Sequence, residues 1–252
     1  MLRTIIPGPP GTGKTFTLTK YLNKELTEYK TDPKRIVYIS FSNAAAQEAQ
    51  RRISDKLYHI GTMHSLGSNE LGINTNTQLL KGNKWNGFKN YSTYCRDLSF
   101  EARTNEFGYV EYINPHMKII EYARSRKLDI QEASIQLEMY QTVETSLTEQ
   151  IEEDLKVYKE NTGMVEYYDM ISQFVEKEKC PLLDVVFLDE AQDLSPLQWD
   201  MFFYIESKCS RSYIAGDDDQ TIYTFQGADP KIFINLKGNF DPQIKSRRVP
   251  KV

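Results

Sequence analysis

Hydrophobic and polar positions along the chain follow two different periods, which predict both strands and helices. Four apolar runs are typical of buried strands: Leu2–Pro7, Arg35–Phe41, Leu182–Glu190 and Ser212–Asp217. Three segments carry apolar residues at helical spacing: 14–29, 43–57 and 196–209. Because strands and helices follow one another near both ends of the chain, we expect an α/β fold, a parallel sheet flanked by helices.

The middle of the chain has a different pattern. Residues 67–87 are rich in Gly, Asn, Ser and Thr, which marks a loop, and helical spacing dominates from there to Lys177. We therefore expect a mainly helical insertion at residues 68–165. The sheet domain would then be made of residues 1–67 and 166–252.

Composition limits the classes of protein that fit this pattern. The 252 residues are 40% hydrophobic and 26% charged, which suits one large domain or a domain with an insertion. No segment has the apolar length of a membrane span, and no signal-peptide pattern follows Met1, so we expect a cytoplasmic protein without membrane contact. Three widely spaced cysteines, outside any CxxC pair, are expected to be reduced and structural: Cys95, Cys180 and Cys209.

The distribution of charge leaves nucleic-acid binding open. A net charge of -4 argues against a protein that coats nucleic acid through its overall charge. Basic residues nevertheless outnumber acidic ones from Lys81 to Lys127, and four aromatic residues lie among them: Trp85, Phe88, Tyr91 and Tyr94. This mixture suits a groove that follows a single strand, and it equally suits a solvated helical surface over ordinary core aromatics.

The segment GPPGTGKT fits the phosphate-binding loop pattern G-x-x-x-x-G-K-[ST] in full. A strand precedes it and a helix follows, so backbone N–H groups and the helix N-terminus would surround phosphates. Lys14 would reach the β- and γ-phosphates, and the Thr15 hydroxyl would ligate Mg²⁺. The alternative is a chance match in a Gly-rich turn. The predicted nucleotide-binding residues are Gly8, Pro9, Pro10, Gly11, Thr12, Gly13, Lys14 and Thr15.

Two adjacent acids follow the apolar run VVFL. Asp189 and Glu190 would emerge at the carboxyl edge of the sheet, where open α/β folds bind their ligands. In that position Asp189 would hold Mg²⁺, and Glu190 would orient and deprotonate an attacking water. Alone, such a pair is as readily the start of a loop. Beside a complete phosphate loop it predicts a nucleotide hydrolase.

Five sequence blocks together resemble the UvrD/Rep-type superfamily 1 DNA helicases. They are SFSNAAAQEAQRRI at 40–53, GTMHSLG at 61–67, YYDMI at 167–171, DEAQD at 189–193 and AGDDDQTIYTFQGAD at 215–229. The resemblance spans most of the chain apart from the insertion. It implies a RecA-like P-loop NTPase domain that uses ATP and Mg²⁺.

The resemblance also implies roles for individual residues. Gln220 would sense the γ-phosphate and contribute to catalysis. Contacts to DNA are implied for Phe41, Ser42, Asn43, Thr62, His64, Tyr223 and Phe225, where Phe225 would stack on a base. A structural role in a loop is the alternative for His64, and a place in the core is the alternative for Tyr223.

Two features depart from the family pattern, and the last residues match it. Seven residues precede Gly8, so the upstream glutamine motif that recognises adenine is not found, and the preference for ATP stays open. Gln226 stands where the family often has arginine. The last residues, KSRRVPKV, resemble motif IV, with Arg248 as the arginine that approaches the γ-phosphate. A second RecA-like domain, in the same or a separate chain, is expected as a partner.

We therefore expect the ATP-binding motor domain of a DNA helicase or translocase. Its partner would be single-stranded or tailed duplex DNA, its polarity 3′ to 5′ by resemblance, and residues 1–252 alone would not unwind DNA. Two alternatives stay open: a P-loop ATPase unrelated to DNA, and a DNA- or partner-binding module without enzymatic activity. Binding of ATP that does not respond to single-stranded DNA would favour the first. The second is disfavoured by the intact site residues Lys14, Thr15, Asp189, Glu190 and Gln220.

Overall fold

A parallel sheet forms the centre of the domain that carries both ends of the described chain. The computed structural model describes residues 1–53, 56–104, 110–217 and 227–244. Within these residues six strands lie in the order β3-β2-β6-β7-β1-β8, and every pairing is parallel. The strands are β1 (Leu2–Pro7), β2 (Ile36–Ser40), β3 (His59–Gly61), β6 (Val185–Asp189), β7 (Arg211–Gly216) and β8 (Asn239–Phe240). The expected α/β fold with a parallel sheet is confirmed.

Helices cover both faces of this sheet. One face carries α1 (Lys14–Thr27) and α2 (Asn43–Arg52); the other carries α3 (Met63–Glu70), α8 (Tyr167–Glu176), α9 (Pro196–Lys208) and α10 (Pro230–Ile234). Successive side chains of a strand point to opposite faces. Phe187 of β6 therefore packs with Leu18 and Leu22 of α1, while Leu188 packs with the α9 side chains Trp199 and Phe202.

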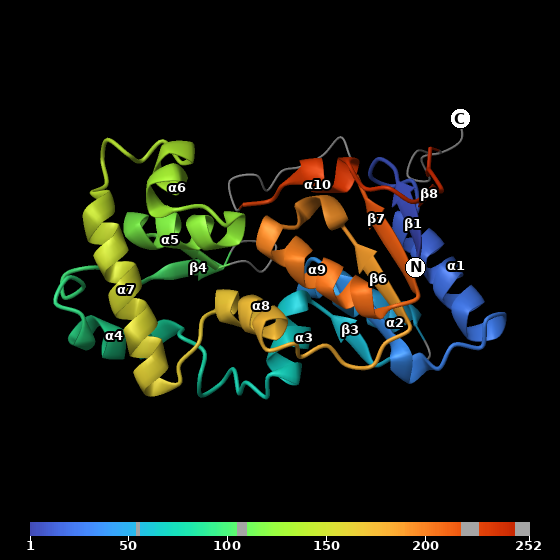
Figure 1. Cartoon of the computed structure of the whole chain (residues 1–252), viewed down its shortest axis with the longest axis horizontal. Coiled ribbons are helices and arrows are strands. Elements are labelled where there is room, and N and C mark those ends of the chain that lie inside the picture. The colour runs from blue at the N-terminus through green and yellow to red at the C-terminus, as the bar shows by residue number, and fades with distance from the viewer. Residues whose placement is uncertain (54–55, 105–109, 218–226, 245–252) are drawn as a thin grey trace.

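Among its described residues, the expected insertion contains four α-helices and two short antiparallel strands. These elements are α4 (Trp85–Tyr91), β4 (Ala102–Thr104), β5 (Val110–Tyr112), α5 (Pro115–Arg126), α6 (Ile130–Gln136) and α7 (Thr145–Thr162). They gather at one end of the molecule, away from the sheet (Figure 1). Their buried residues, from Leu80 to Tyr158, form a hydrophobic cluster of their own. In the described part of the chain, no helix is both long and apolar enough to cross a membrane.

The chain enters and leaves these helices at one place. Leu80 N donates to Val165 O at 2.8 Å, and Val165 N donates to Gln78 O at 2.9 Å. The helix α8 then begins at Tyr167 and returns the chain to the sheet. The two connections between the sheet and the helices α4–α7 therefore lie side by side.

Element boundaries differ from the expected ones where the sequence signal is weak. Helix α2 ends at Arg52, five residues before the expected end, because Ile53 takes an extended backbone conformation. Helix α3 continues to Glu70, into the segment expected to be a loop. The strands β3, β4, β5 and β8 were not predicted, since runs of two or three residues are too short to show a period.

Candidate nucleotide and single-strand site

The phosphate-binding loop connects β1 to α1. Its first residue is bound to β7, the neighbour of β1 in the sheet, because Gly8 N donates to Gly216 O at 3.1 Å. Gly11 and Gly13 have φ angles of 76° and 93°, a left-handed conformation that favours glycine. Gly13 directly precedes α1, so the loop turns into the helix there and its N–H groups face the space in front of the helix. Thr12 Oγ1 donates to Pro9 O at 2.8 Å and closes the loop on itself.

Lys14 lies under this loop and is almost fully buried. Its Nζ donates to Gly8 O at 2.6 Å and lies 3.9 Å from Asp217 Oδ2 at the end of β7. A buried ammonium group requires negative partners. The amine therefore lies where a phosphate group would compete with these oxygens for it.

Thr15 and Asp189 meet although their segments come from non-adjacent strands. β7 lies between β1 and β6 in the sheet, yet Thr15 Oγ1 donates to Asp189 Oδ2 at 2.9 Å. Tyr38 OH on β2 donates to the same oxygen at 3.2 Å. Burial, with the neighbouring Glu190, raises the pKa of Asp189 to about 6, and these hydrogen bonds oppose that rise. A hydroxyl beside a carboxylate is the oxygen donor set that suits Mg²⁺.

Glu190 follows with an unusual backbone conformation. Its φ of 57° places it in the left-handed region, which is uncommon for a residue with a side chain and is found where surrounding contacts enforce it. Its backbone N–H donates to Asp189 Oδ1 at 3.1 Å, and its carboxylate accepts from Gln192 Nε2 at 3.0 Å. The two acids are thus held at the carboxyl edge of the sheet, as the sequence predicted.

The described residues among those expected to contact DNA follow β2 and β3, at the same edge of the sheet. Ser42 Oγ accepts from Ala45 N and begins α2, while Thr62 Oγ1 accepts from Ser65 N and begins α3. Asn43 is exposed at the start of α2. Both hydroxyl oxygens therefore cap helix N-termini, a location that also favours phosphate.

Phe41 and His64 line one small cavity of about 100 Å³ between the sheet domain and α5. The His64 ring packs edge-on against Tyr167, with 5.5 Å between the ring centroids. Burial lowers the pKa of His64 to about 4, so the ring is neutral near pH 7. Asp193 lines the same cavity, and burial, together with the charge of Glu190, raises its pKa to about 7.

Several expected site residues lie outside the described residues: Gln220, Tyr223, Phe225, Gln226 and Arg248. Other residues at the site had not been singled out from the sequence. Tyr38, Gln192 and Asp217 all bond to residues of the predicted site. Asp217 had a usable signal, since it is an acid that follows an apolar strand. Tyr38 carries no local pattern of this kind, and Gln192 lies within the DEAQD block, where no role was expected for it.

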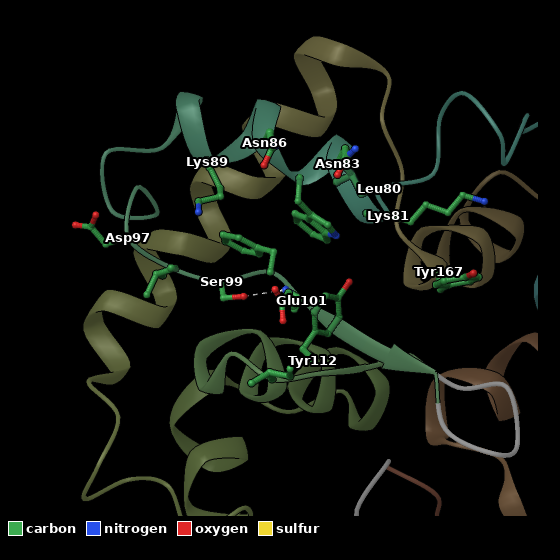
Figure 2. A pocket seen from close by; sticks show the side chains of 15 residues that line it. Leu80, Lys81, Asn83, Asn86, Lys89, Asp97, Ser99, Glu101, Tyr112 and Tyr167 are labelled. Atoms are coloured by element: carbon green, nitrogen blue, oxygen red, sulfur yellow. Dashed lines mark hydrogen bonds between the residues drawn. The ribbon is translucent and has the colours of Figure 1, made fainter.

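A larger cavity of about 750 Å³ lies beside α4, and it is lined mainly by residues 80–89, 97–101 and 112–113 (Figure 2). Trp85 and Phe100 stack with 5.0 Å between their ring centroids, and both are buried. Phe88 is buried as well, so it and Trp85 are core aromatics, whereas Tyr91 and Tyr94 are exposed. Both signs of charge line the cavity: Lys81, Lys89, Asp97 and Glu101.

Comparison with known proteins gives consistent matches. A family model described as UvrD/REP helicase N-terminal domain matches residues 3–241. The ATP-dependent DNA helicase Rep of Buchnera aphidicola is 23% identical over 93% of this chain and 38% of its own length. A probable DNA helicase II homolog of Mycoplasma capricolum is 22% identical over 93% of this chain and 34% of its own length. The ATP-dependent DNA helicase PcrA of Staphylococcus epidermidis is 21% identical over 96% and 35%. The chain thus spans about a third of the length of these curated relatives.

Proposed function

We propose, since the chain belongs to the UvrD/REP helicase N-terminal domain family, that it is the MgATP-binding motor domain of a DNA helicase or translocase. One observation carries this proposal. The Thr15 hydroxyl and the Asp189 carboxylate lie 2.9 Å apart, and Lys14 and Glu190 are their direct neighbours along the chain. A phosphate-facing amine, a magnesium donor pair and a carboxylate base are thereby assembled from segments far apart in sequence.

Each residue has a separate chemical role in this proposal. Lys14 neutralises charge on the β- and γ-phosphates, and the N–H groups of the loop bind their oxygens. Thr15 and Asp189 hold Mg²⁺, which supplies electrostatic stabilisation when it is bound. Glu190 accepts the proton of the attacking water. We assign Gln220 and Arg248 to the γ-phosphate from the family resemblance.

A single DNA strand is the proposed second ligand. The helix N-termini at Ser42 and Thr62 would bind phosphates, with Asn43 exposed beside them. Phe41 and His64 would contact bases, and Tyr223 and Phe225 join this set through the family resemblance. Because His64 is neutral near pH 7, we expect the ring to contribute shape and stacking rather than charge.

We further propose that residues 1–67 and 166–252 form the motor domain and that residues 68–165 form a separate insertion. The hydrophobic clusters support this division, because the cluster of the insertion contains residues from Leu80 to Tyr158 alone.

Translocation 3′ to 5′ is proposed from the family resemblance. A strand-displacement assay of the full-length protein on 3′- and 5′-tailed duplexes tests it, and preference for the 5′ tail would refute it.

ATP hydrolysis with and without single-stranded DNA tests the proposed function. We expect the full-length protein to hydrolyse MgATP and the strand to stimulate hydrolysis. Glu190→Gln should lower kcat by about 10²- to 10⁴-fold, the contribution of a general base, while ATP binding is retained. A rate of hydrolysis that is the same with and without single-stranded DNA would favour a P-loop ATPase unrelated to DNA. Absence of ATP binding would favour a binding module.

A further inference from the structure

Gln192 lies at the centre of the candidate nucleotide site. Its side chain is buried, with the residue 4% exposed. Nε2 donates to Glu190 Oε2 at 3.0 Å and to Asp193 Oδ2 at 3.1 Å, and Oε1 accepts from Asp217 N at 2.8 Å. One carboxamide therefore joins the acid that follows β6 to the backbone at the end of β7.

We call the bond from Gln192 Nε2 to Glu190 the first arm of this carboxamide, and the bond from Asp217 N to Gln192 Oε1 the second. The first arm restricts the Glu190 side chain. A glutamate has several rotamers, and a general base has to lie within hydrogen-bond reach of the water that it deprotonates. The Glu190 backbone is already fixed in a left-handed conformation between β6 and the turn Ala191–Asp193. The bond from Gln192 Nε2 selects one direction for the carboxylate from that backbone.

The second arm holds the end of β7. Asp217 lies beside Lys14, with 3.9 Å between Nζ and Oδ2, so this strand end borders the phosphate-binding loop. In the sequence Asp217 directly precedes the segment 218–226, which contains Gln220. Because Asp217 N donates to Gln192 Oε1, a displacement of the strand end would also displace the side chain that holds Glu190.

We propose that Gln192 is a positioning residue for ATP hydrolysis: its amide nitrogen fixes the Glu190 carboxylate, and its amide oxygen fixes the end of β7. The proposal rests on the proposed function, in which Glu190 is the general base. The hydrogen bonds of the Gln192 side chain go to Glu190, Asp193 and the Asp217 backbone. It acts through Glu190, and it links the direction of that carboxylate to the position of β7.

Two substitutions separate the arms of the carboxamide. Gln192→Leu removes both, whereas Gln192→Glu keeps an oxygen for the Asp217 N–H and loses the donor to Glu190. In the full-length protein, kcat should fall about 10- to 100-fold in both variants, the cost of a misplaced catalytic group, with the KM for ATP within about twofold of the parent. Gln131→Leu, the same exchange on the exposed side of α6, should leave both parameters unchanged.

A double-mutant cycle with Glu190→Gln distinguishes positioning from a structural role. If Gln192 acts through Glu190, adding Gln192→Leu to Glu190→Gln should reduce kcat by less than about twofold further. A full further reduction, multiplying the two single losses, would overturn the proposal. If instead Glu190→Gln leaves kcat unchanged, the proposed base is wrong; a normal kcat in Gln192→Leu beside an impaired Glu190→Gln defeats the positioning role alone.

Amide hydrogen exchange of residues 1–252 tests the second arm without any turnover. The Asp217 N–H should exchange at least about tenfold faster in Gln192→Leu than in the parent and stay protected in Gln192→Glu, because the exchange of a buried amide depends on its hydrogen bond. The amides of Ile214 and Ala215, which lie within β7, serve as internal references. Unchanged protection of Asp217 in Gln192→Leu would overturn the link to β7.

Discussion

At the scale of single residues, Lys14 provides the most direct test of nucleotide binding. Its amine is buried between Gly8 O and Asp217, where phosphate oxygens would replace these contacts. We expect Lys14→Ala to raise the Kd for MgATP at least about tenfold, the loss of one charge-assisted contact. Lys20→Ala, on the exposed side of the same helix, is the matched control. Equal Kd values for Lys14→Ala and the parent in calorimetry would contradict the role of Lys14.

His64 predicts a pH dependence of stability. Burial lowers its pKa from 6.5 to about 4. Between these pH values the His64 ring is therefore protonated in the unfolded chain and neutral in the folded chain. Stability is therefore complete above about pH 6.5 and falls as the pH drops toward 4. Between about pH 7.5 and pH 5, the unfolding free energy of the parent should fall by about 2 kcal/mol more than that of His64→Gln. Urea unfolding measures both values. Parallel losses in the two proteins would mean that the ring is not excluded from water as inferred.

The residues of the site differ in how far the sequence could predict them. Lys14 and Thr15 belong to a contiguous motif, and Asp189 and Glu190 follow an apolar strand, so local patterns identified all four. Gln192 lies within the DEAQD block, but its bond to the Asp217 N–H depends on the packing of β6 beside β7. Such a contact has no spacing rule along the chain, and only the folded geometry reveals it.

At the scale of elements, hydrophobic periodicity predicts the long helices and fails for the shortest strands. Helix α1 begins at the expected residue and ends two residues early, and α9 ends one residue early. β3 has three residues, and its sequence His-Ile-Gly contains a single aliphatic side chain. It is a strand because Val37 and Ile39 of β2 offer backbone partners, which is information from tertiary structure.

A buried ion-pair network joins α7 to α8. Lys159 Nζ lies 2.8 Å from Glu166 Oε2 and 2.9 Å from Asp169 Oδ1, and Arg124 of α5 also reaches Glu166 at 2.7 Å. Although burial raises the pKa of Glu166, the two cations outweigh it and lower that pKa overall. Lys159→Met removes the cation that pairs with the buried Asp169 and leaves Glu166 with Arg124 alone, so it should lower the unfolding free energy by about 3–5 kcal/mol.

Chemical denaturation measures this loss, and Lys156→Met is its control because Lys156 is exposed on the same helix. The control should differ from the parent by less than about 0.5 kcal/mol, as is usual for surface changes. If Lys159→Met unfolds at the same denaturant concentration as the parent, the network between α7 and α8 contributes nothing to stability.

At the scale of the whole molecule, the helices α4–α7 and the sheet are joined by a limited set of contacts. The chain crosses between them next to the Leu80–Val165 hydrogen bonds. Further contacts come from α5, where Arg126 donates to Ala228 O at 2.9 Å and Lys127 pairs with Asp200. Ala228 follows Gly227, whose φ of 94° and closeness to Ser125 exclude a larger residue at that position. The composition of the chain could not predict this junction, because it depends on the direction in which the insertion packs.

This arrangement predicts that the insertion can be removed without loss of the nucleotide site. A short Gly-Ser linker can replace residues 80–164, because the chain enters and leaves the helices side by side. Removal of this segment leaves the buried acids Glu166 and Asp169 without their cation Lys159. The variant therefore also carries Glu166→Gln and Asp169→Asn. The phosphate-binding loop and the acids after β6 lie outside the removed segment. The shortened chain should therefore fold and bind MgATP with a Kd within about twofold of the parent, as expected for independent sites. Circular dichroism and calorimetry measure both properties. A shortened chain that is unfolded, or that binds no MgATP where the parent does, would show that the sheet domain depends on the insertion.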